Sequence, residues 1–396
     1  MPTSPPASPE ARGLRPALPG LLALALAVFV AITTEMLPVG LLPQIGRDLG
    51  VGEGRAGLLV TVYAVMVAVL AVPMTMVTAR LPRKPVLLAT LVGYTLSNVL
   101  VALAPGFATL ALGRALGGVS HALFFSVAIG YGPRLVPPLL VGRAITIVLS
   151  GASLGNILGV PLATSIGTAI GWRPAFVTVA AMAAALTVVV ALLLPAAEGV
   201  PRRTGPRPTR SWWRPTITAV GGANALVFLG HFAAWTYIAP LLLAAGAREN
   251  QVGPVLLLLG GVGIIGVWGA ALFVDRRPRA GLLTTLTAMV LALVGLWLGQ
   301  DSLGWVVAAA VLWSAAMGSV PTLTQAAALR TGDVGPDIAG ALVNGTSNLG
   351  IAVGAALGGV VVGSAGVGAV PLLAAGVLLA CLVVILLARR GFPTRP

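Results

Sequence analysis

Apolar residues dominate the chain in runs of about 20 or more, and short segments rich in Pro, Gly, Arg or other polar residues separate these runs. A helix of about 20 mostly apolar residues is long enough to cross the hydrocarbon core of a bilayer. The pattern predicts twelve such helices, near residues 17–42, 56–78, 85–104, 107–131, 144–170, 174–195, 215–245, 252–274, 280–299, 302–328, 338–363 and 367–388. We therefore predict an all-α membrane protein with twelve transmembrane helices.

A polar stretch in the middle of the chain divides the predicted helices into six and six. Residues 196–214 hold five Arg and three Pro, which is the composition of a linker. We predict a six-helix N-terminal half (17–195), a cytoplasmic linker (196–214) and a six-helix C-terminal half (215–388). Residues 1–16 form a Pro-rich tail that we expect to be disordered and cytoplasmic, and residues 389–396 form a second cytoplasmic tail.

The composition supports a membrane protein and excludes several kinds of site. The chain is 58% hydrophobic and 9% charged, with a mean hydropathy of +1.01, whereas a soluble domain carries about 25% charged residues. The single Cys, Cys381, excludes a disulfide framework within one chain and a cysteine metal cluster. With only two His residues in addition, we predict no metal site and no cofactor.

Basic residues are distributed unevenly between the two sides of the predicted membrane. If the N-terminus is cytoplasmic, 19 of the 24 Lys and Arg residues lie inside, four lie outside and Arg114 lies within a helix. Short cytoplasmic loops carry such an excess in membrane proteins, so we predict that both termini are cytoplasmic. The formal net charge of +14 is thereby dispersed over loops beside anionic lipid, which favours the bilayer as partner and excludes nucleic acid. One Lys against 23 Arg fits a GC-rich bacterial genome, hence a bacterial inner membrane.

Two pairs of segments repeat at about half the chain length. In TARLPRKPVLL (78–88) and VDRRPRAGLLT (274–284), Arg80 and Arg83 of the first copy recur as Arg276 and Arg279 of the second. GASLGNILG (151–159) and GTSNLGIAVG (345–354) share Gly, Ser and a closing GxxxG. Parallel repeats of this kind predict a substrate site near the midplane, between halves that rock against each other.

Five segments resemble the major facilitator superfamily over nearly the whole chain. They are TTEMLPVGLLPQI (33–45), RALGGVSHALF (114–124), LGNILGVPLATSIG (154–167), GHFAAWTYIAPLL (230–242) and NGTSNLGIAVGAALGG (344–359). The chain is most similar to the twelve-helix drug/proton antiporter group, in its arabinose-efflux, sugar-efflux and chloramphenicol-efflux-like branch. The resemblance implies the major facilitator fold and export by alternating access.

The loop after the second helix departs from the family pattern. Ala79 stands where the family motif has Asp, and Pro82 stands at its second Gly, whereas the second-half copy keeps Asp275. We expect Arg80, Arg83, Asp275 and Arg276 to take part in the conformational change.

Small residues in the fifth and eleventh helices are expected to let helices of the two halves approach closely and rearrange. These residues are Gly155, Gly159, Gly350 and Gly354. Pro161 is expected to kink the fifth helix.

Glu35 raises the question of what a carboxylate does in an apolar helix, where an acid costs roughly 2.5–3.5 kcal/mol at the centre. We predict an ion pair with Arg114 that acts as a proton switch. The alternatives are that Glu35 reaches the outer interface, and that Arg114 binds a main-chain carbonyl. His121 lies seven residues after Arg114 on the same helix face, with Gly118 leaving room between them, so it is a third candidate for proton coupling. A packed, hydrogen-bonded histidine is the alternative.

Polar and aromatic residues of other helices are candidates for binding substrate. They are Phe124, His231, Trp235, Tyr237, Asn344 and Asn348. The aromatic side chains could stack on a substrate, and the two Asn, four residues apart, share a helix face. Packing and helix-to-helix hydrogen bonds are the alternatives.

We predict a monomeric secondary transporter that uses proton entry to export a small neutral or weakly polar molecule, with an amphenicol-like drug favoured. Sugar or nucleoside efflux, or a facilitator or importer of the same fold, are the alternatives. A membrane enzyme is disfavoured because the predicted helices hold no nucleophile–base pair and no paired acids. A non-transporting receptor is the remaining alternative.

Overall fold

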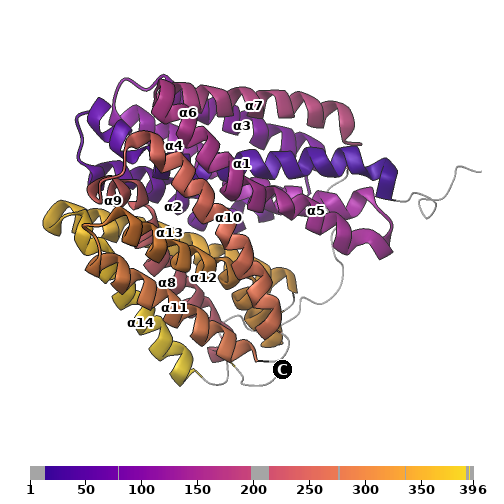
Figure 1. Ribbon diagram of the computed structural model, residues 1–396. Helices are drawn as coiled ribbons and strands as arrows, with labels where there is room; N and C mark the ends of the chain where they lie inside the picture. Colours follow the sequence, from indigo (N-terminus) through magenta and orange to yellow (C-terminus); the bar gives the residue numbers. More distant parts are fainter. Residues whose placement is uncertain are drawn as a thin grey trace, which may run out of the picture.

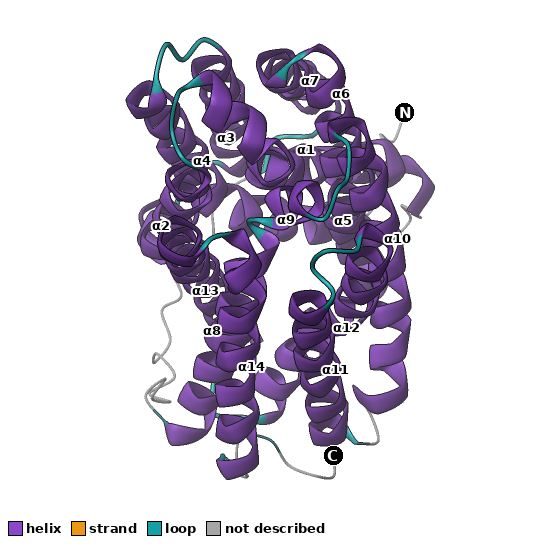
Figure 2. Ribbon diagram, turned by 60° about the vertical axis from the view of Figure 1, so that its left-hand side comes forward, coloured by secondary structure: helices purple, strands orange, loops and turns teal. Residues whose placement is uncertain are grey.

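The computed structural model describes residues 14–78, 80–197, 214–274, 277–334, 336–388 and 392. Within these ranges the chain forms helices joined by short connections and contains no strand (Figure 2). Twelve helical segments are long and apolar enough to span a membrane. The all-α, twelve-helix fold predicted from the apolar runs is confirmed.

The first six spans contain seven α-helices. They are α1 (Leu14–Asp48), α2 (Glu53–Thr78), α3 (Arg83–Ala102), α4 (Phe107–Tyr131), α5 (Val141–Leu154), α6 (Val160–Ile170) and α7 (Trp172–Leu193). The fifth span comprises α5 and α6, joined by a π-helical turn over Gly155–Gly159. Pro161 follows this turn and lacks the N–H that a regular helix needs at this point, which accounts for an irregularity here.

The second six spans also contain seven α-helices. They are α8 (Pro215–Trp235), α9 (Ile238–Ala244), α10 (Glu249–Val274), α11 (Pro278–Leu298), α12 (Leu303–Arg330), α13 (Pro336–Ala365) and α14 (Val370–Leu387). The seventh span comprises α8 and α9, with a turn at Thr236–Tyr237 between them.

The first helix continues six residues beyond the predicted end at residue 42. The added residues, PQIGRD, include a proline and two charges, so composition alone indicates a loop. In the structure both charges have partners: Arg47 pairs with Glu249, and Asp48 pairs with Arg173. These tertiary contacts stabilise a helix end that local propensity disfavours.

The helices form two groups that meet at one end and diverge toward the other (Figure 1). The first group, coloured indigo to magenta, meets the second, coloured orange to yellow, beside α9. Buried apolar side chains between residues 217 and 392 form one hydrophobic cluster, which also takes in side chains of α1 and α2 and Val160 of α6. A second cluster consists of residues 21–194 alone.

Close backbone contacts and one ion pair join the two groups at their meeting end. A Cβ on Gly54 of α2 would overlap the carbonyl oxygen of Gly359 of α13, so these helices touch through bare backbone. Arg47 of α1 pairs with Glu249 of α10, and Gln44 Nε2 donates to the same carboxylate at 3.1 Å. The distribution of Arg predicts that this end faces outward.

Several predicted features fall outside the described residues. They are Asp275, Arg276, residues 1–13 of the first tail, residues 198–213 of the linker, and residues 389–391 and 393–396 of the second tail. The boundaries of the two halves and of the linker stay predictions.

Candidate functional site

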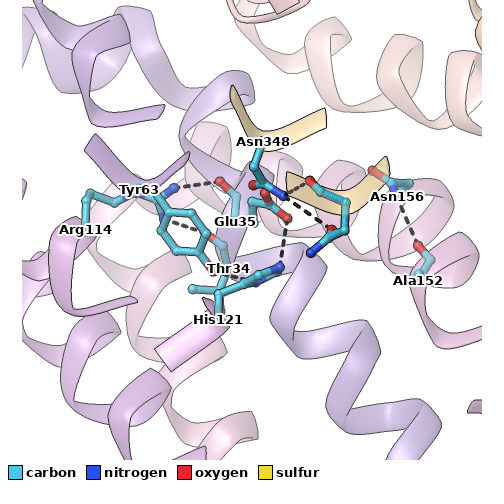
Figure 3. Close-up of polar contacts among 9 residues, drawn as sticks. Thr34, Glu35, Tyr63, Arg114, His121, Ala152, Asn156 and Asn348 are labelled. Atoms are coloured by element: carbon cyan, nitrogen blue, oxygen red, sulfur yellow. Dashed lines mark hydrogen bonds and ion pairs between the residues drawn. The ribbon is translucent and has the colours of Figure 1, made fainter. Parts of the chain in front are cut away.

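Glu35 lies in the interior of the first half, where its side chain faces His121. The residue is 5% exposed, and its Oε2 lies 3.7 Å from Nε2 of His121 (Figure 3). The alternative that Glu35 reaches the outer interface is therefore wrong. Among the described residues no ion pair joins the Glu35 carboxylate to Arg114, so that prediction is also wrong. The carboxylate faces His121 instead, which is charged only when it is protonated.

Arg114 binds three main-chain carbonyls instead. Its Nη1 donates to Thr34 O at 2.6 Å, its Nη2 to Glu35 O at 2.7 Å, and its Nε to Leu59 O at 3.2 Å. The guanidinium also lies 4.2 Å from the ring centroid of Tyr63, a cation–π distance. Arg114 thus joins α4 to α1 and α2, as the carbonyl alternative predicted.

Pro38 explains why a carbonyl is available to Arg114 at this point. In an α-helix the N–H of residue 38 would donate to the carbonyl of residue 34, but proline has no N–H. Thr34 O is left without its intrahelical donor in an apolar interior, where an unpaired carbonyl is costly. The Arg114 guanidinium supplies that hydrogen bond and fixes the backbone next to Glu35.

His121 connects Glu35 to a tyrosine that the sequence analysis missed. Tyr63 of α2 has its hydroxyl 2.8 Å from Nδ1 of His121, on the opposite side of the ring from Glu35 (Figure 3). The imidazole therefore lies between a phenol and a carboxylate. A buried tyrosine hydroxyl normally has a partner, so the four Tyr residues of this chain were a usable signal.

Two predicted substrate-binding residues are buried away from any accessible surface. Phe124 is fully buried in the core of the first half, edge-on to Tyr94 at 5.5 Å. Tyr237 is also fully buried and donates to Ala355 O at 2.9 Å. Both side chains are packed against protein in this conformation, and substrate contact by either stays a prediction.

His231 and Trp235 of α8 belong to an aromatic cluster in the second half. Their rings stack with centroids 5.4 Å apart and an interplanar angle of 20°. Trp313 of α12, which the sequence analysis missed, lies 5.0 Å from His231 and 5.6 Å from Trp235. His231 follows Glu35 by 196 residues, the interval that also separates Arg80 from Arg276.

The two asparagines of α13 share one helix face, as their spacing predicted. Asn348 (Figure 3) is buried, and its Nδ2 donates to Asn344 O at 3.1 Å. Asn344 is exposed. The helix-to-helix hydrogen bonds come from Asn224 of α8 instead, whose Nδ2 donates to Val343 O at 3.0 Å.

The small residues of the fifth and eleventh spans contact helices of their own half. A Cβ on Gly155 or Gly159 would meet α1, and a Cβ on Gly350 or Gly354 would meet α8. The expectation that these four glycines form the contact between halves is wrong. Between the halves, α10 approaches the fifth span instead, where a Cβ on Gly260 would lie 2.9 Å from Ile157 Cα.

The remaining conformational candidates lie at two places. A Cβ on Gly118 would meet Met66 Cβ at 2.7 Å, so this glycine lets α4 pack directly on α2. Arg80 is exposed in the turn after α2, and the main-chain N–H of Arg83 donates to Ala197 O at 2.7 Å.

No cluster of metal-ligating side chains occurs in the part of the chain that the structure describes.

Comparison with known proteins gives three consistent similarities. The sequence profile of the Major Facilitator Superfamily matches residues 24–335. A chloramphenicol efflux pump of Mycobacterium tuberculosis is 36% identical over 351 residues, which cover 85% of this chain and 84% of the pump. The inner membrane transport protein YdhP of Escherichia coli O157:H7 is 35% identical over 382 residues, 93% of this chain and 96% of YdhP.

One solved structure shares the fold over the full length. It is a bacterial homolog of the human lysosomal transporter Spinster in an inward-facing and unoccupied conformation. The TM-score is 0.75 at 18% identity, and the match covers 97% of this chain and 99% of that one. At this identity the likeness establishes the fold alone.

Proposed function

Because this chain belongs to the Major Facilitator Superfamily, we propose that it exports a small neutral or weakly polar molecule, an amphenicol-like drug, in exchange for protons. The family and the bacterial relatives indicate a membrane transporter rather than an enzyme, with many spans in the inner membrane. Export as the direction of transport, the proton as the coupling ion and a small neutral molecule as the substrate are what we propose in addition.

The arrangement of Glu35, His121 and Tyr63 is the single observation on which proton coupling rests. A carboxylate in an apolar interior is stable only with a partner or in its protonated form. The 3.7 Å separation from His121 Nε2 is an ion-pair distance but exceeds a hydrogen bond. Glu35 is therefore held near a partner and remains free to accept a proton.

Protonation of Glu35 would change the forces between α1 and α4. The neutral acid loses its attraction to the imidazole, whose other nitrogen stays bound to Tyr63. Since interiors are close-packed, such a change favours one of two packed arrangements over the other. The electrical part of the driving force is about 2.3 kcal/mol per proton per 100 mV.

Arg114 acts as a positioning residue in this proposal. It donates hydrogen bonds to the carbonyls of Thr34 and Glu35. These bonds fix the backbone from which the Glu35 side chain extends. A guanidinium remains charged throughout the cycle, which suits a fixed anchor rather than a group that exchanges protons.

An amphenicol is the favoured substrate because a relative with 36% identity over most of the chain is a chloramphenicol efflux pump. The small number of charged side chains in the interior of the first half agrees with a neutral substrate. Glu35 and Arg114 are the charged side chains in the interior of the first half's described helices, and they bind His121 and backbone carbonyls.

The test uses everted membrane vesicles with an acid interior and a pH-sensitive dye. Chloramphenicol, sugars, nucleosides and lipophilic cations are added in turn. We expect chloramphenicol to release protons from vesicles with the wild-type protein and not from vesicles with Glu35→Gln. Asp301→Asn, which removes an exposed carboxylate in the turn between α11 and α12, is the matched control and should behave as wild type.

Other outcomes would change the proposal in defined ways. Substrate movement without proton release would identify a facilitator. Proton release with sugars or nucleosides alone would replace the amphenicol by those substrates. Normal proton release from Glu35→Gln would remove Glu35 from the coupling mechanism.

A further inference from the structure

Two buried nitrogen atoms without hydrogen-bond partners lie in the aromatic cluster of the second half. They are Nδ1 of His231 and Nε1 of Trp313. His231 is 6% exposed and Trp313 is fully buried. Their rings are in contact, with centroids 5.0 Å apart and an interplanar angle of 63°.

An unpaired buried polar group costs about 1–3 kcal/mol. Native proteins pair nearly all such groups with protein or ordered water, so an exception calls for an explanation. Among the buried side-chain atoms without a partner in the described chain, these two lie on rings that touch, so one small molecule can satisfy both. The indole N–H can only donate, so it requires an acceptor, and the imidazole nitrogen bonds either to a donor or to an acceptor.

The surroundings of these atoms define what kind of molecule fits. Trp235 stacks on His231 and is half-buried, so the cluster is not sealed off completely. The sequences of α8 and α12 contain no acidic residue, and their single basic residue is Arg330 in the last turn of α12. A charged group would find no counter-ion beside His231 on these two helices. The flat face of an aromatic or amide group would find the flat ring of Trp235 to stack on.

We infer that His231, Trp235 and Trp313 form a substrate subsite for the neutral, planar part of the exported molecule. The ring of Trp235 stacks on that part. The Trp313 N–H donates to an oxygen or nitrogen of the substrate, and His231 Nδ1 bonds to a hydroxyl or amide N–H. This subsite deepens the proposed function and rests on it, since it assumes a transported small molecule.

The internal repeat gives the subsite a place in the transporter. Glu35 of α1 and His231 of α8 are separated by the interval that relates the two halves. Each lies on the first helix of its half, and each contacts the fourth helix of that half, through His121 in one case and Trp313 in the other. One half thus presents a group that can exchange a proton, and the other presents unpaired groups that can hold a neutral ligand.

Equilibrium dialysis with the purified full-length protein in detergent tests the subsite without any proton gradient. The probes are chloramphenicol, uridine, arabinose and tetraphenylphosphonium. We expect the two planar neutral probes to bind more tightly than arabinose or the cation. Trp313→Phe keeps an aromatic ring and removes the N–H, and it should weaken chloramphenicol binding about tenfold, which corresponds to about 1.4 kcal/mol.

Two further variants keep the test decisive. His231→Phe removes the second nitrogen and should weaken binding by a similar factor if Trp313→Phe fails to fold. Trp268→Phe changes a tryptophan of α10 that is 72% exposed, and it should bind like wild type. Thermal unfolding of each variant separates lost packing from lost ligand contacts, because a purely structural role would change stability and leave the Kd unchanged.

Three outcomes would overturn the subsite: unchanged chloramphenicol binding in both Trp313→Phe and His231→Phe, binding of tetraphenylphosphonium in preference to the neutral probes, and no binding of either planar neutral probe. Failure of the proposed function looks different. In that case the planar probes bind and the two variants weaken them, but the vesicles release no protons.

Discussion

Pro38 and Arg114 illustrate how one residue creates a requirement that another meets. The proline leaves Thr34 O without its helical donor, and the guanidinium donates to it at 2.6 Å. The same guanidinium reaches Glu35 O and Leu59 O. The geometry of Arg, with five donors in a planar fork, allows one side chain to serve three acceptors on two helices.

Arg114→Lys is predicted to lower both stability and transport. A lysine ammonium is a compact charge and cannot reach carbonyls on α1 and α2 together, and each lost hydrogen bond to a charged group costs about 1.5–3 kcal/mol. We expect a clear fall in Tm in detergent. Arg173→Lys is the control, since Arg173 pairs with Asp48 where both side chains are partly exposed. Equal Tm values for the two variants would contradict the anchoring role.

Tyr63→Phe is predicted to impair coupling although both Glu35 and His121 are retained. The Tyr63 hydroxyl lies 2.8 Å from His121 Nδ1. When it donates to Nδ1, the proton of the neutral ring is on Nε2, the nitrogen that faces Glu35. A hydrogen bond of about 1 kcal/mol corresponds to a roughly fivefold loss of substrate-driven proton release. Tyr131→Phe, whose hydroxyl bonds to Pro195 O, should retain the wild-type signal. Full release from Tyr63→Phe would exclude the tyrosine from the mechanism.

At the scale of elements, glycines decide how closely helices approach. Gly155 and Gly159 bring the fifth span onto α1, and Gly350 and Gly354 bring α13 onto α8, so both pairs consolidate one half. The contacts between halves use different glycines, Gly54 with Gly359 among them. The glycines that pack helices within one half are therefore different from the glycines that form the contact between the halves.

Gly54→Ala is predicted to weaken the contact between the two groups of helices. The new Cβ would overlap the carbonyl oxygen of Gly359, and a backbone atom in a packed helix cannot move aside as a flexible side chain can. We expect α2 and α13 to separate at the predicted outer end, measured as increased labelling of a cysteine that replaces the fully buried Ala56 of α2. Gly52→Ala, where a Cβ meets open space, should leave the labelling rate unchanged. Unchanged labelling in Gly54→Ala would show that this contact does not hold the halves together.

At the scale of the whole molecule, the two groups of helices touch at one end and diverge at the other (Figure 1). The polar part of the contact is the Arg47–Glu249 ion pair with Gln44 on the same carboxylate. Both charged side chains are roughly half exposed, so the pair contributes about 0.2–1 kcal/mol. A contribution of this size shifts the balance between states without locking either one.

Glu249→Gln is predicted to move a fraction of molecules toward an outward-open state. At 0.2–1 kcal/mol the population ratio changes by about 1.4- to 5-fold. Spin labels at positions 106 and 301, in a Cys381→Ser background, would report longer distances across the predicted outer end. Asp48→Asn breaks a pair within the first half and serves as control. Distances that match wild type in Glu249→Gln would assign the gate to the apolar and backbone contacts alone.

The sequence by itself determined the spans, because the bilayer requires about 20 apolar residues wherever the chain crosses it. It also identified Glu35, Arg114 and His121 as exceptional, because polar side chains in apolar helices are costly wherever they point. The division into two related halves followed from the repeated loops around Arg80 and Arg276.

Only the tertiary structure decided which of these groups face each other. Arg114 bonds to main-chain carbonyls, among them the Thr34 O that Pro38 leaves without a helical donor, and the Glu35 carboxylate faces His121. Tyr63 lies against His121, and Trp313 lies against His231, because the fold brings together helices that are distant in the chain. Helix periodicity fixes which residues share a face of one helix, whereas the partners across helices depend on packing angles that arise from the whole fold.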